Sequence, residues 1–433
     1  MKFTFEKYSF DAERFEAKFE YSYGEQKFVE KVSFVHKAGS ENLAPETQSV
    51  LDRAVFLAFI LIGTSYWKAF PTREVELATE IDRWQAEFFD HVYQEGMSQF
   101  AYGNQLTRDD LAHFAASNAK PSRPPHFQGD GVLVLQSGGK DSLLTAQLLE
   151  TAGLNYTPLY FSSVQGHHPA VLNELNEPIL TAGRAIDRNA LRETAERGAM
   201  NGHVPVTYII ESLAIVQAIL LGKNQILASI GNEADEPHAH IGDLAVNHQW
   251  SKSWAAETAL SEYARRYISP DIRIGSPLRA FSELEIAELF SELAWSRFGN
   301  GFSSCNRANY RQGNVNEELH WCGECPKCAN SYLLFAPFIP AHELQALFGG
   351  KDLFADEKLA LTFKGLLGID GVTKPFECIG SVEELRKAYE MIDFDSGYAR
   401  LPFPVPHSDF DYQVLGDCQK WAHELIQKAL PDK

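Results

Sequence analysis

Hydrophobic and polar residues alternate in the first part of the chain, and longer apolar runs follow. Residues 27–35 read Lys-Phe-Val-Glu-Lys-Val-Ser-Phe-Val, a pattern that is typical of a half-buried β-strand. Residues 54–62 are all apolar. This run is too short to cross a bilayer, so it predicts a helix that is buried in a protein core. For residues 1–125 we therefore expect a small β-sheet followed by helices.

A strand–helix alternation begins near residue 126. The apolar runs at residues 131–135, 158–161 and 225–230 have the length of strands, and residues 143–149 and 214–221 carry leucine or isoleucine at helical spacing. Strands that alternate with helices pair in parallel and are covered by helices. The pattern predicts an α/β fold around a parallel sheet, and ligands of such sheets bind beyond the carboxyl ends of the strands.

Two changes in composition divide the chain. The proline-rich segment 119–125 precedes the first strand of the α/β part and has the character of a linker. From residue 299 the chain becomes irregular, rich in glycine and cysteine-bearing. We therefore expect three regions: an N-terminal α+β region at residues 1–125, the α/β domain at 126–300, and a C-terminal region with the cysteines at 301–433.

The turn after the apolar run 131–135 carries the most specific motif of the chain. Its residues are Ser137, Gly138, Gly139, Lys140, Asp141 and Ser142. Glycines let the backbone approach a ligand closely, and the N–H groups at the start of a helix point toward an anion. The lysine adds positive charge, and the serines add hydroxyl donors. The motif therefore predicts a phosphate site; the alternative is a glycine–serine turn with two chance charges.

This hexapeptide resembles the SGGxDS loop of the PP-loop ATP pyrophosphatases. The resemblance implies a HUP-like parallel sheet that binds ATP at residues 126–300, with Ser137 to Ser142 around the pyrophosphate part of the nucleotide. In that family ATP is split between its α and β phosphates, so that a substrate oxygen becomes adenylated. Mg²⁺ is expected to shield the phosphate charge. Asp141 is expected either to hold this ion or to cap the helix.

A cysteine quartet marks the C-terminal region. Two residues separate Cys322 from Cys325 and Cys325 from Cys328, and Cys305 lies upstream. Four thiolates can close a tetrahedral Zn²⁺ site with no open position, so the predicted metal is structural. An iron–sulfur cluster and unmetallated thiols are the alternatives. The grouping favours metal ligation in a reducing cytosol over a disulfide framework.

Charge and the start of the chain exclude some partners. The 433 residues carry a formal net charge of −19 at pH 7. Extended contact with nucleic acid needs stripes of lysine and arginine, so we expect no nucleic-acid partner. The first residues, Met-Lys-Phe-Thr-Phe-Glu-Lys, lack the apolar stretch of a signal peptide. We expect a cytoplasmic protein without a membrane partner, and the sequence predicts no oligomeric state.

Five further segments narrow the resemblance: residues 63–69, 100–104, 247–253, 321–328 and 374–380. Together they are similar to the ATP-dependent UDP-N-acetylmuramoyl-L-alanyl-L-glutamate epimerases of peptidoglycan synthesis. This resemblance implies a UDP-muramoyl dipeptide substrate whose terminal L-glutamate is inverted through an acyl-adenylate, with release of AMP and pyrophosphate. A similar cysteine quartet occurs in 7-cyano-7-deazaguanine synthase, so an adenylating amide or nitrile synthase is the alternative function. A non-catalytic nucleotide sensor is a further alternative.

The residues that would transfer protons are harder to predict. His248 is the best histidine candidate because imidazole titrates near neutrality, although a structural role fits equally well. Glu233 follows a predicted strand and is expected to be a Mg²⁺ ligand, a base or a surface turn residue. Asp141 completes the catalytic candidates. Lys252 is expected to pair with phosphate or to be solvated, and the Cys378 thiol, outside the quartet, is expected to be inert.

Two other groups have alternative interpretations. The aromatic residues Trp67, Phe100 and Tyr102 are candidates for stacking on uracil or sugar, but aromatic residues at such positions more often belong to a core. His238 and His240 lie near acidic residues and are either ligands of a second metal or part of an exposed acidic turn, and we favour the turn.

Overall fold

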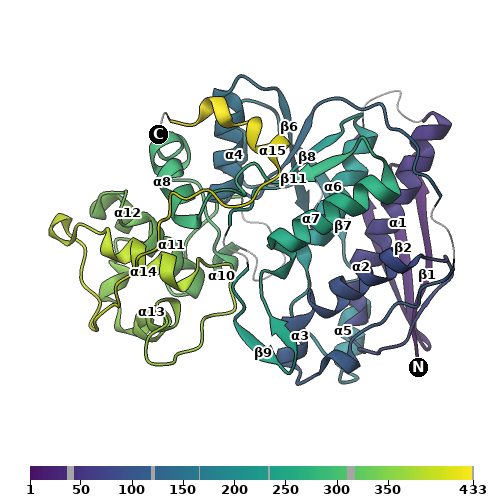
Figure 1. Ribbon diagram of the computed structural model, residues 1–433, viewed down its shortest axis with the longest axis horizontal. Coiled ribbons are helices and arrows are strands. Elements are labelled where there is room, and N and C mark those ends of the chain that lie inside the picture. The colour runs from purple at the N-terminus through teal and green to yellow at the C-terminus, as the bar shows by residue number, and fades with distance from the viewer. Residues whose placement is uncertain (37–42, 119–121, 165, 233–234, 310–316, 432–433) are drawn as a thin grey trace.

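The computed structural model describes residues 1–36, 43–118, 122–164, 166–232, 235–309 and 317–431, which are arranged as Figure 1 shows. Its strands are β1 (Phe3–Asp11), β2 (Glu16–Tyr23), β3 (Gln26–Ser33), β4 (Val75–Leu77), β5 (Val132–Leu135), β6 (Tyr156–Ser162), β7 (Leu180–Ala185), β8 (Gln225–Leu227), β9 (Ala239–Ile241), β10 (Leu244–Val246) and β11 (Arg273–Gly275). Its α-helices are α1 (Pro45–Trp67), α2 (Arg83–Gln94), α3 (Ser98–Gly103), α4 (Lys140–Thr151), α5 (Arg188–Ala195), α6 (Val206–Leu220), α7 (Trp254–Tyr263), α8 (Glu283–Leu293), α9 (Trp295–Phe298), α10 (Asn306–Asn309), α11 (Pro326–Phe335), α12 (Ala341–Leu347), α13 (Ala360–Leu366), α14 (Val382–Glu390) and α15 (Lys420–Glu424).

Nine strands form one sheet in the order β11-β8-β5-β6-β7-β3-β2-β1-β4. The strands from β11 to β7 are parallel, and Val132 of β5 lies between Gln225 of β8 and Tyr156 of β6. The strand β3 then pairs antiparallel with β7, and β2 and β1 continue the sheet. The prediction of an α/β protein with a largely parallel sheet is confirmed. The N-terminal strands do not form a small sheet of their own, however, because the free edge of β7 pairs with β3.

The strands at the centre of the sheet are buried on both faces. Along β5, Leu133 packs in the core that contains α1 and α6, whereas Val132 and Val134 pack in the core that contains α4 and α8. Successive side chains of a strand point to opposite faces, so a strand between two helical layers needs a continuous apolar run. The strand predicted at residues 131–135 is confirmed. The strand predicted at 225–230 is shorter, since β8 has only three residues.

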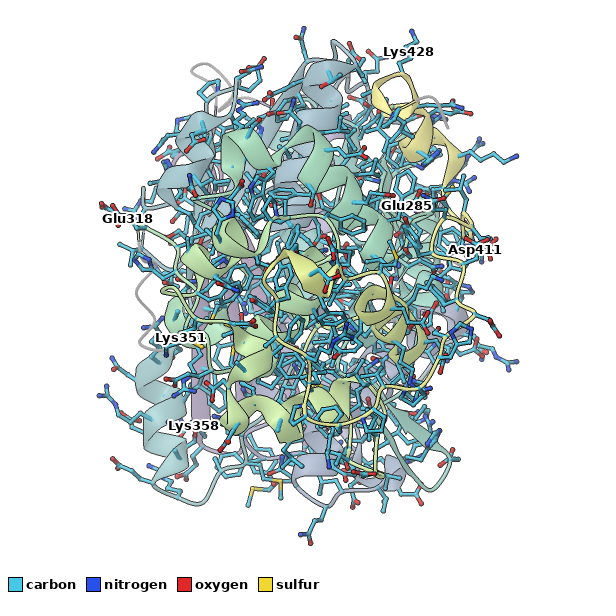
Figure 2. All side chains as sticks on the ribbon, turned by 90° about the vertical axis from the view of Figure 1, so that its left-hand side faces the viewer. Glu285, Glu318, Lys351, Lys358, Asp411 and Lys428 are labelled. Carbon is cyan, nitrogen blue, oxygen red and sulfur yellow. The ribbon has the colours of Figure 1, made fainter. Side chains whose placement is uncertain are left out.

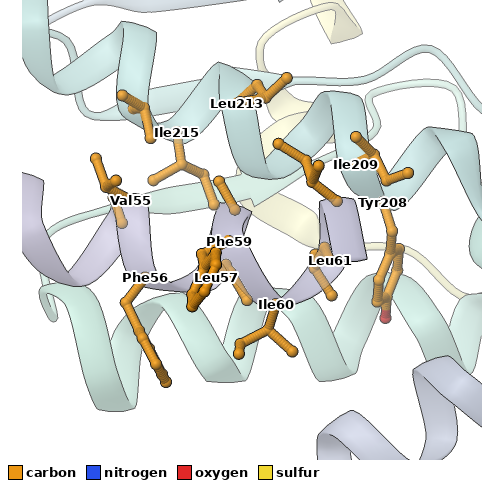
Figure 3. Close-up of a cluster of buried hydrophobic side chains, with 14 of the residues drawn as sticks. Val55, Phe56, Leu57, Phe59, Ile60, Leu61, Tyr208, Ile209, Leu213 and Ile215 are labelled. Carbon is orange, nitrogen blue, oxygen red and sulfur yellow. The ribbon is translucent and has the colours of Figure 1, made fainter. Parts of the chain in front are cut away.

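Helix α1 is the buried helix that residues 54–62 predicted. It has 23 residues and packs against α6, where Phe59 and Leu61 lie near Leu213 and Ile215 (Figure 3). In the described part of the chain, α1 is the one helix long and apolar enough to cross a membrane, but 83% of its most apolar window is buried inside the protein. Core helices meet the same test, so α1 is weak evidence for a membrane span.

The C-terminal helices surround a second core beside the sheet. Helices α11, α13 and α14 pack together, and α11 and α14 also contact α8. The chain then crosses back over the molecule to α15, which lies beside α4 (Figure 1). Along this return the Ser282 hydroxyl donates to the carbonyl of Tyr412, and Gln419 Nε2 donates to Glu257 Oε1. The tail therefore ties the C-terminal helices to the sheet.

Charged side chains are spread over the face that the C-terminal helices form. Figure 2 views this face, with Lys351 and Lys358 toward one end, Lys428 at the other, and Glu318 and Asp411 toward the edges. The lysines labelled on this face do not form a single stripe. The expectation that nucleic acid is not a partner stays a prediction.

Candidate functional site

The candidate site lies where the order of the parallel strands reverses. Counted along the chain, β5 is the first of these strands; β6 and β7 lie on one side of it, and β8 and β11 lie on the other. Connections that leave neighbouring strands in opposite directions open a crevice at their carboxyl ends. The glycine loop, which we define as residues 137–142, follows β5 at this crevice, and Gly231 follows β8. Glu233 lies outside the described residues.

The glycine loop turns sharply from β5 into α4. Gly138 has a φ of 78°, a conformation that residues with a Cβ rarely adopt. The Ser142 hydroxyl donates to the Gly139 carbonyl, and the Ser137 N–H donates to Ser142 Oγ, both at 3.2 Å. Gly139 is the N-cap of α4, and no side chain caps this helix. The predicted strand, loop and helix are confirmed, the first N–H groups of α4 have no side-chain cap, and Asp141 does not act as the cap.

Lys140 is buried between two carboxylates. Its Nζ lies 2.5 Å from Asp141 Oδ1 and 2.6 Å from Oε2 of Glu283, the first residue of α8. Its side chain is only 7% exposed. Burial lowers the pKa of Lys140, but the two carboxylates more than offset this and raise it above its ordinary value. Lys140 thus joins the starts of α4 and α8, and the phosphate contact that the sequence suggested for it stays a prediction.

Another buried carboxylate, that of Glu384, lies near this ion pair. Glu384 of α14 accepts hydrogen bonds from the N–H of Leu284 in α8 and from the N–H of Ser381. Burial is the main cause that raises the pKa of Glu384 to about 7, and the charge of Glu283 adds to it. The starts of α4, α8 and α14 are therefore linked through one row of charged side chains.

Three lysines surround Asp141. Burial raises the pKa of Asp141, but Lys140 and also Lys252 and Lys327 lower it, so that the pKa lies below its ordinary value. Lys252 precedes α7, and Lys327 lies in the first turn of α11. Positive charge therefore reaches the glycine loop from two elements that are far apart in the sequence. Such a cluster raises the local concentration of anions.

A buried arginine holds the backbone on either side of the crevice. The side chain of Arg279 is fully buried, and its Nε donates to Glu257 Oε2 at 2.8 Å. Its Nη1 donates to the carbonyl of Gly231 at 2.6 Å, and its Nη2 donates to the carbonyl of Lys252 at 2.7 Å. A planar guanidinium can satisfy three acceptors at once. Arg279 therefore fixes the turn after β8 and the segment that carries Lys252.

His248 lies near the same two lysines. Its Nδ1 is 2.6 Å from Gln99 Oε1. Because an amide oxygen can only accept, this contact requires the proton on Nδ1, and the lone pair of the neutral ring is then on Nε2. Burial is the main cause that lowers the pKa of His248 to about 4; the charge of Glu377 opposes the shift, and Lys252 and Lys327 add to it. His248 is therefore neutral at pH 7.

Two other histidines form a cluster with His248. The ring centroids of His203 and His238 lie 4.5 Å and 6.3 Å from that of His248. Burial is the main cause that lowers the pKa of His203 to about 3 and that of His238 to about 4. Among the described residues, the four cysteines are the only group of ligand atoms close enough to hold one metal ion. His238 and His240 therefore form no second metal centre there.

The 374–380 segment bridges the two halves of the site. Phe376 stacks on His238, with the ring centroids 5.2 Å apart and the planes 16° from parallel. Two residues later, the carbonyl of Cys378 accepts a hydrogen bond from Lys327 Nζ at 2.5 Å. The segment thus contacts the histidine cluster on one side and the first turn of α11 on the other, and it brings Glu377 toward His248.

The four cysteines lie together as predicted. The sulfur atoms of Cys305 and Cys325 are 3.7 Å apart, those of Cys322 and Cys328 are 3.7 Å apart, and those of Cys325 and Cys328 are 3.5 Å apart. A tetrahedral Zn²⁺ with Zn–S bonds of 2.3 Å would place its sulfur ligands about 3.8 Å apart. The N–H of Ala308 donates to one of these sulfurs. The donor set and its geometry therefore fit a structural metal and are compatible with zinc.

The cysteine cluster is in contact with the glycine loop. The N–H of Ser303, two residues before Cys305, donates to the Gly138 carbonyl at 3.2 Å. A Cβ added to Gly138 would lie 2.6 Å from Leu319 Cδ1, and one added to Gly139 would lie 3.0 Å from a serine hydroxyl at position 304. The positive φ and the close neighbour both favour glycine at position 138, whereas at position 139 the serine hydroxyl would have to move by a few tenths of an ångström.

A pocket of 410 Å³ lies away from these residues, beside α1 and α2. Its lining includes Arg53, Asp52, Tyr8, Asp82 and Tyr267. It contains none of the loop, histidine or cysteine residues described above. We place the candidate active site at the glycine loop, because the convergent lysines, the helix start and the histidine are there.

The structure brings most of the predicted residues into one region. The charges of Lys252 and Lys327 lower the pKa of both Asp141 in the glycine loop and His248, and the segment that carries Cys305 contacts the loop. Sequence reasoning assigned no role to Lys327, Glu283 or Arg279. The signal for Lys327 was its place between two cysteine ligands. Glu283 and Arg279 gave none, because their partners are distant in the sequence.

Comparison with known proteins decides the family. Residues 1–276 match the family model described as the MurL N-terminal domain, and residues 301–403 match the one described as the MurL C-terminal domain. The chain belongs to the MurL family. Three curated relatives in this family are named UDP-N-acetyl-alpha-D-muramoyl-L-alanyl-L-glutamate epimerase. The resemblance to these epimerases is therefore confirmed.

The relatives come from three bacteria. The protein of Micromonospora sp. is 35% identical over 88% of this chain and 84% of its own length. That of Salinispora tropica is 32% identical over 92% of this chain and 86% of its own length. That of Xanthomonas oryzae pv. oryzae is 34% identical over 79% of this chain and 75% of its own length. Enzymes with this name are isomerases. The two family models together match both the part of this chain with the glycine loop and the part with the cysteines.

Proposed function

We propose that this protein is an ATP-dependent epimerase that inverts the terminal L-glutamate of UDP-N-acetylmuramoyl-L-alanyl-L-glutamate in cytoplasmic peptidoglycan precursor synthesis. One observation carries the proposal. In a chain whose relatives have this epimerase name, the charges of the same two lysines act on a glycine loop without a side-chain cap and on a neutral histidine. The loop supplies backbone N–H groups that can bind phosphate, and the histidine supplies a base that can accept the α-proton of the substrate.

The residues around the loop fit the phosphates of ATP, as a PP-loop would. The N–H groups at the start of α4 have no side-chain cap and suit an anion. Lys252 and Lys327 contribute positive charge, whereas the charge of Lys140 is balanced by two carboxylates. Asp141 has a lowered pKa and is therefore charged at pH 7, which suits a ligand of Mg²⁺. The ion would shield the phosphate charge when bound.

Activation of the carboxylate explains why an epimerase would need ATP. The glutamate nitrogen of the substrate is part of an amide, so it cannot form an imine with a pyridoxal cofactor. Removal of the α-proton beside a free carboxylate would place two negative charges on neighbouring groups. In the proposed step a carboxylate oxygen attacks the α-phosphorus of ATP, and the bond from that phosphorus to pyrophosphate breaks. The resulting mixed anhydride can accept the electron pair of the carbanion as an enolate.

The rate advantage follows from the acidity of the carbon. Each unit by which activation lowers the pKa of the α-carbon removes about 1.4 kcal/mol from the thermodynamic barrier. His248 is the proposed proton-transfer residue, because its Nδ1–H is engaged with Gln99 and its Nε2 can accept the α-proton. Return of a proton to the opposite face, followed by attack of water on the anhydride, gives AMP and the D-glutamyl product. Glu233 and Asp141 stay candidates for catalysis or for Mg²⁺.

The cysteine quartet is proposed to bind Zn²⁺ in a structural role. Four thiolates would complete the coordination, so that no position stays open for substrate. The zinc would fix the chain around Cys305, which contacts the glycine loop through Ser303, and the first turn of α11, which carries Lys327. Its contribution to the reaction would be to hold these residues in place.

Isotope exchange tests the proposed function. The complete protein, Mg²⁺, ATP and the UDP-muramoyl dipeptide are incubated in D₂O, and the glutamate α-carbon is analysed for deuterium together with AMP formation. We expect both products, and neither with an ATP analogue whose α–β bridge cannot be cleaved. Asp141→Asn should abolish both, while the matched control Asp109→Asn, at a side chain that is 95% exposed, should leave them unchanged.

The same incubation separates the epimerase from the alternative. An amide or nitrile synthase would pass the activated acyl group to ammonia or another amine and would leave the α-hydrogen in place. AMP formation that requires an amine, with no deuterium in the product, would refute the epimerase and favour the synthase.

A further inference from the structure

We infer that the exposed ring of Tyr102, supported by Phe376, is the surface on which the pyrimidine base of the uridine diphosphate substrate stacks. The inference rests on the proposed function, which supplies the substrate class, and it names the part of the site that would hold the nucleotide end of that substrate. It assigns Tyr102 as a binding residue for the base and Phe376 as the residue that supports its ring.

The structure separates Tyr102 from the other aromatic residues of its sequence neighbourhood. Trp67 is 0% and Phe100 is 1% exposed, so both belong to the core. Tyr102 is 44% exposed, and it is the one aromatic residue among the exposed large hydrophobic side chains of the described residues. Of the three candidates for stacking on uracil or sugar, only Tyr102 is therefore accessible to a ligand.

The ring of Tyr102 is supported from behind. Its centroid lies 5.4 Å from that of Phe376, with the planes tilted by 41°. Phe376 in turn stacks on His238 at 5.2 Å. An exposed tyrosine by itself indicates nothing, but this ring packs at a tilt against Phe376, which is stacked on His238 of the histidine cluster. A base that stacks on Tyr102 would add one more ring to this group.

The position of Tyr102 agrees with the shape of the substrate. The short helix α3 carries both Tyr102 and Gln99, and Gln99 is hydrogen-bonded to His248. From the other direction, Phe376 belongs to the 374–380 segment that reaches Lys327 beside the glycine loop. The 374–380 segment therefore contacts Tyr102 through Phe376 and Lys327 through Cys378, and the charge of Lys327 acts on Asp141 of the glycine loop. The proposed substrate has its base at one end and the glutamate to be activated at the other, so it would reach from Tyr102 to the loop.

Stacking has an expected size and an expected specificity. A base that stacks on an aromatic side chain gains about 1–3 kcal/mol, as measured by alanine substitution, and every base has a face that can stack. Loss of the Tyr102 ring should therefore weaken the binding of UDP by at least about fivefold. It should weaken CDP to a similar degree, because the ring contacts the face of the base and not its edge.

Direct binding of UDP to the complete protein tests the inference. The dissociation constants of UDP and of Mg-ATP are measured by calorimetry for the wild-type chain, Tyr102→Ala and Tyr102→Phe. We expect that Tyr102→Ala weakens UDP binding at least about fivefold and changes Mg-ATP binding less than twofold. Tyr102→Phe keeps the ring and should bind UDP within twofold of the wild type. Leu361→Ala, at a side chain that is 66% exposed on α13, is the matched control and should change neither constant.

Three results would overturn the inference. They are unchanged UDP binding in Tyr102→Ala, an equal loss in Tyr102→Phe and Tyr102→Ala, and no UDP binding to the wild type at millimolar concentration. Unchanged Mg-ATP binding shows that the variants are folded. The proposed function is decided separately: if the wild type fails to epimerise the dipeptide the function is wrong, whereas the UDP measurements still decide the role of Tyr102.

Discussion

The buried ion pair between Arg279 and Glu257 offers the sharpest stability test in this structure. The two side chains are 0% and 5% exposed. Arg279 donates to Glu257 and to two backbone carbonyls, and Glu257 also accepts from Gln419 Nε2 at 2.9 Å. Glu211 lies nearby, and burial followed by the charge of Glu257 raises its pKa well above its ordinary value. Arg279 is the cation that balances the charge of Glu257.

Replacement of Arg279 by Met keeps the approximate length of the side chain but removes the charge and all three donors. Glu257 then becomes a buried charge without its cation, and two carbonyls lose their partner. Removal of one member of a buried ion pair typically costs 3–5 kcal/mol of unfolding free energy. We expect about that loss for Arg279→Met. Because Arg279 holds the carbonyl of Lys252, we also expect weaker binding of Mg-ATP.

The assay is urea denaturation at pH 7, followed by tryptophan fluorescence, of the wild type, Arg279→Met, Glu257→Gln and the double variant. The double variant removes both charges, so its loss should be smaller than the sum of the single losses by at least about 2 kcal/mol. The matched control is Arg265→Met. Arg265 pairs with Glu262 at 3.4 Å, but its side chain is 59% exposed, and its loss should cost less than about 1 kcal/mol. A loss below 1 kcal/mol for Arg279→Met, or additive single losses, would refute this account of the pair.

Three further predictions concern the carboxylate, the metal and the lysines. The pKa of Glu384 is raised from 4.5 to about 7, so its contribution to stability is present below pH 4.5 and is lost as the pH rises through 7. Glu384→Gln should remove this pH dependence, which is on the order of 3 kcal/mol between those two pH values. Thermal melts of both proteins at several pH values measure it, and an unchanged pH profile would contradict the prediction. If the quartet binds zinc as proposed, Cys325→Ser should abolish zinc binding and lower the melting temperature, as metal analysis and calorimetry would show. A variant that keeps one zinc per chain would disprove the assigned ligand set. Lys327→Met and Lys252→Met should each weaken Mg-ATP binding at least about tenfold. Each should also raise the pKa of His248 in an NMR titration, because each lysine lowers that pKa. An unchanged pKa of His248 would show that the lysines do not act on this residue.

Local patterns made the glycine loop and the cysteine quartet predictable. In the loop, a strand, a turn with a positive φ at Gly138 and a helix follow one another within a few residues. In the quartet, the spacing of the cysteines already restricts the geometry of a metal site. Both kinds of signal are short in sequence, and the structure confirms the local arrangement of each.

Long-range pairing limited the rest of the prediction. The strand at residues 27–35 was recognised from its alternation, but nothing in that alternation shows that β3 pairs with β7, about 150 residues further along the chain. Likewise Arg279 has the sequence context of an ordinary loop residue, and only the folded chain shows that it reaches Gly231 and Lys252. Buried charges of this kind are decided by tertiary contacts, which periodicity does not report.

The distribution of positive charge suggests why this family would keep the cysteine-bearing region beside the sheet. If the glycine loop binds phosphate as proposed, it needs positive charge from other residues, because Lys140 is paired with Asp141 and Glu283. One of the two lysines that reach Asp141, Lys327, stands between two cysteines of the quartet, and its Nζ is hydrogen-bonded to the 374–380 segment. If the lysine is placed by the metal cluster, then loss of the metal and loss of Lys327 should impair nucleotide binding in the same way and should not be additive. The C-terminal region would thus be part of the nucleotide site and not only a support for it.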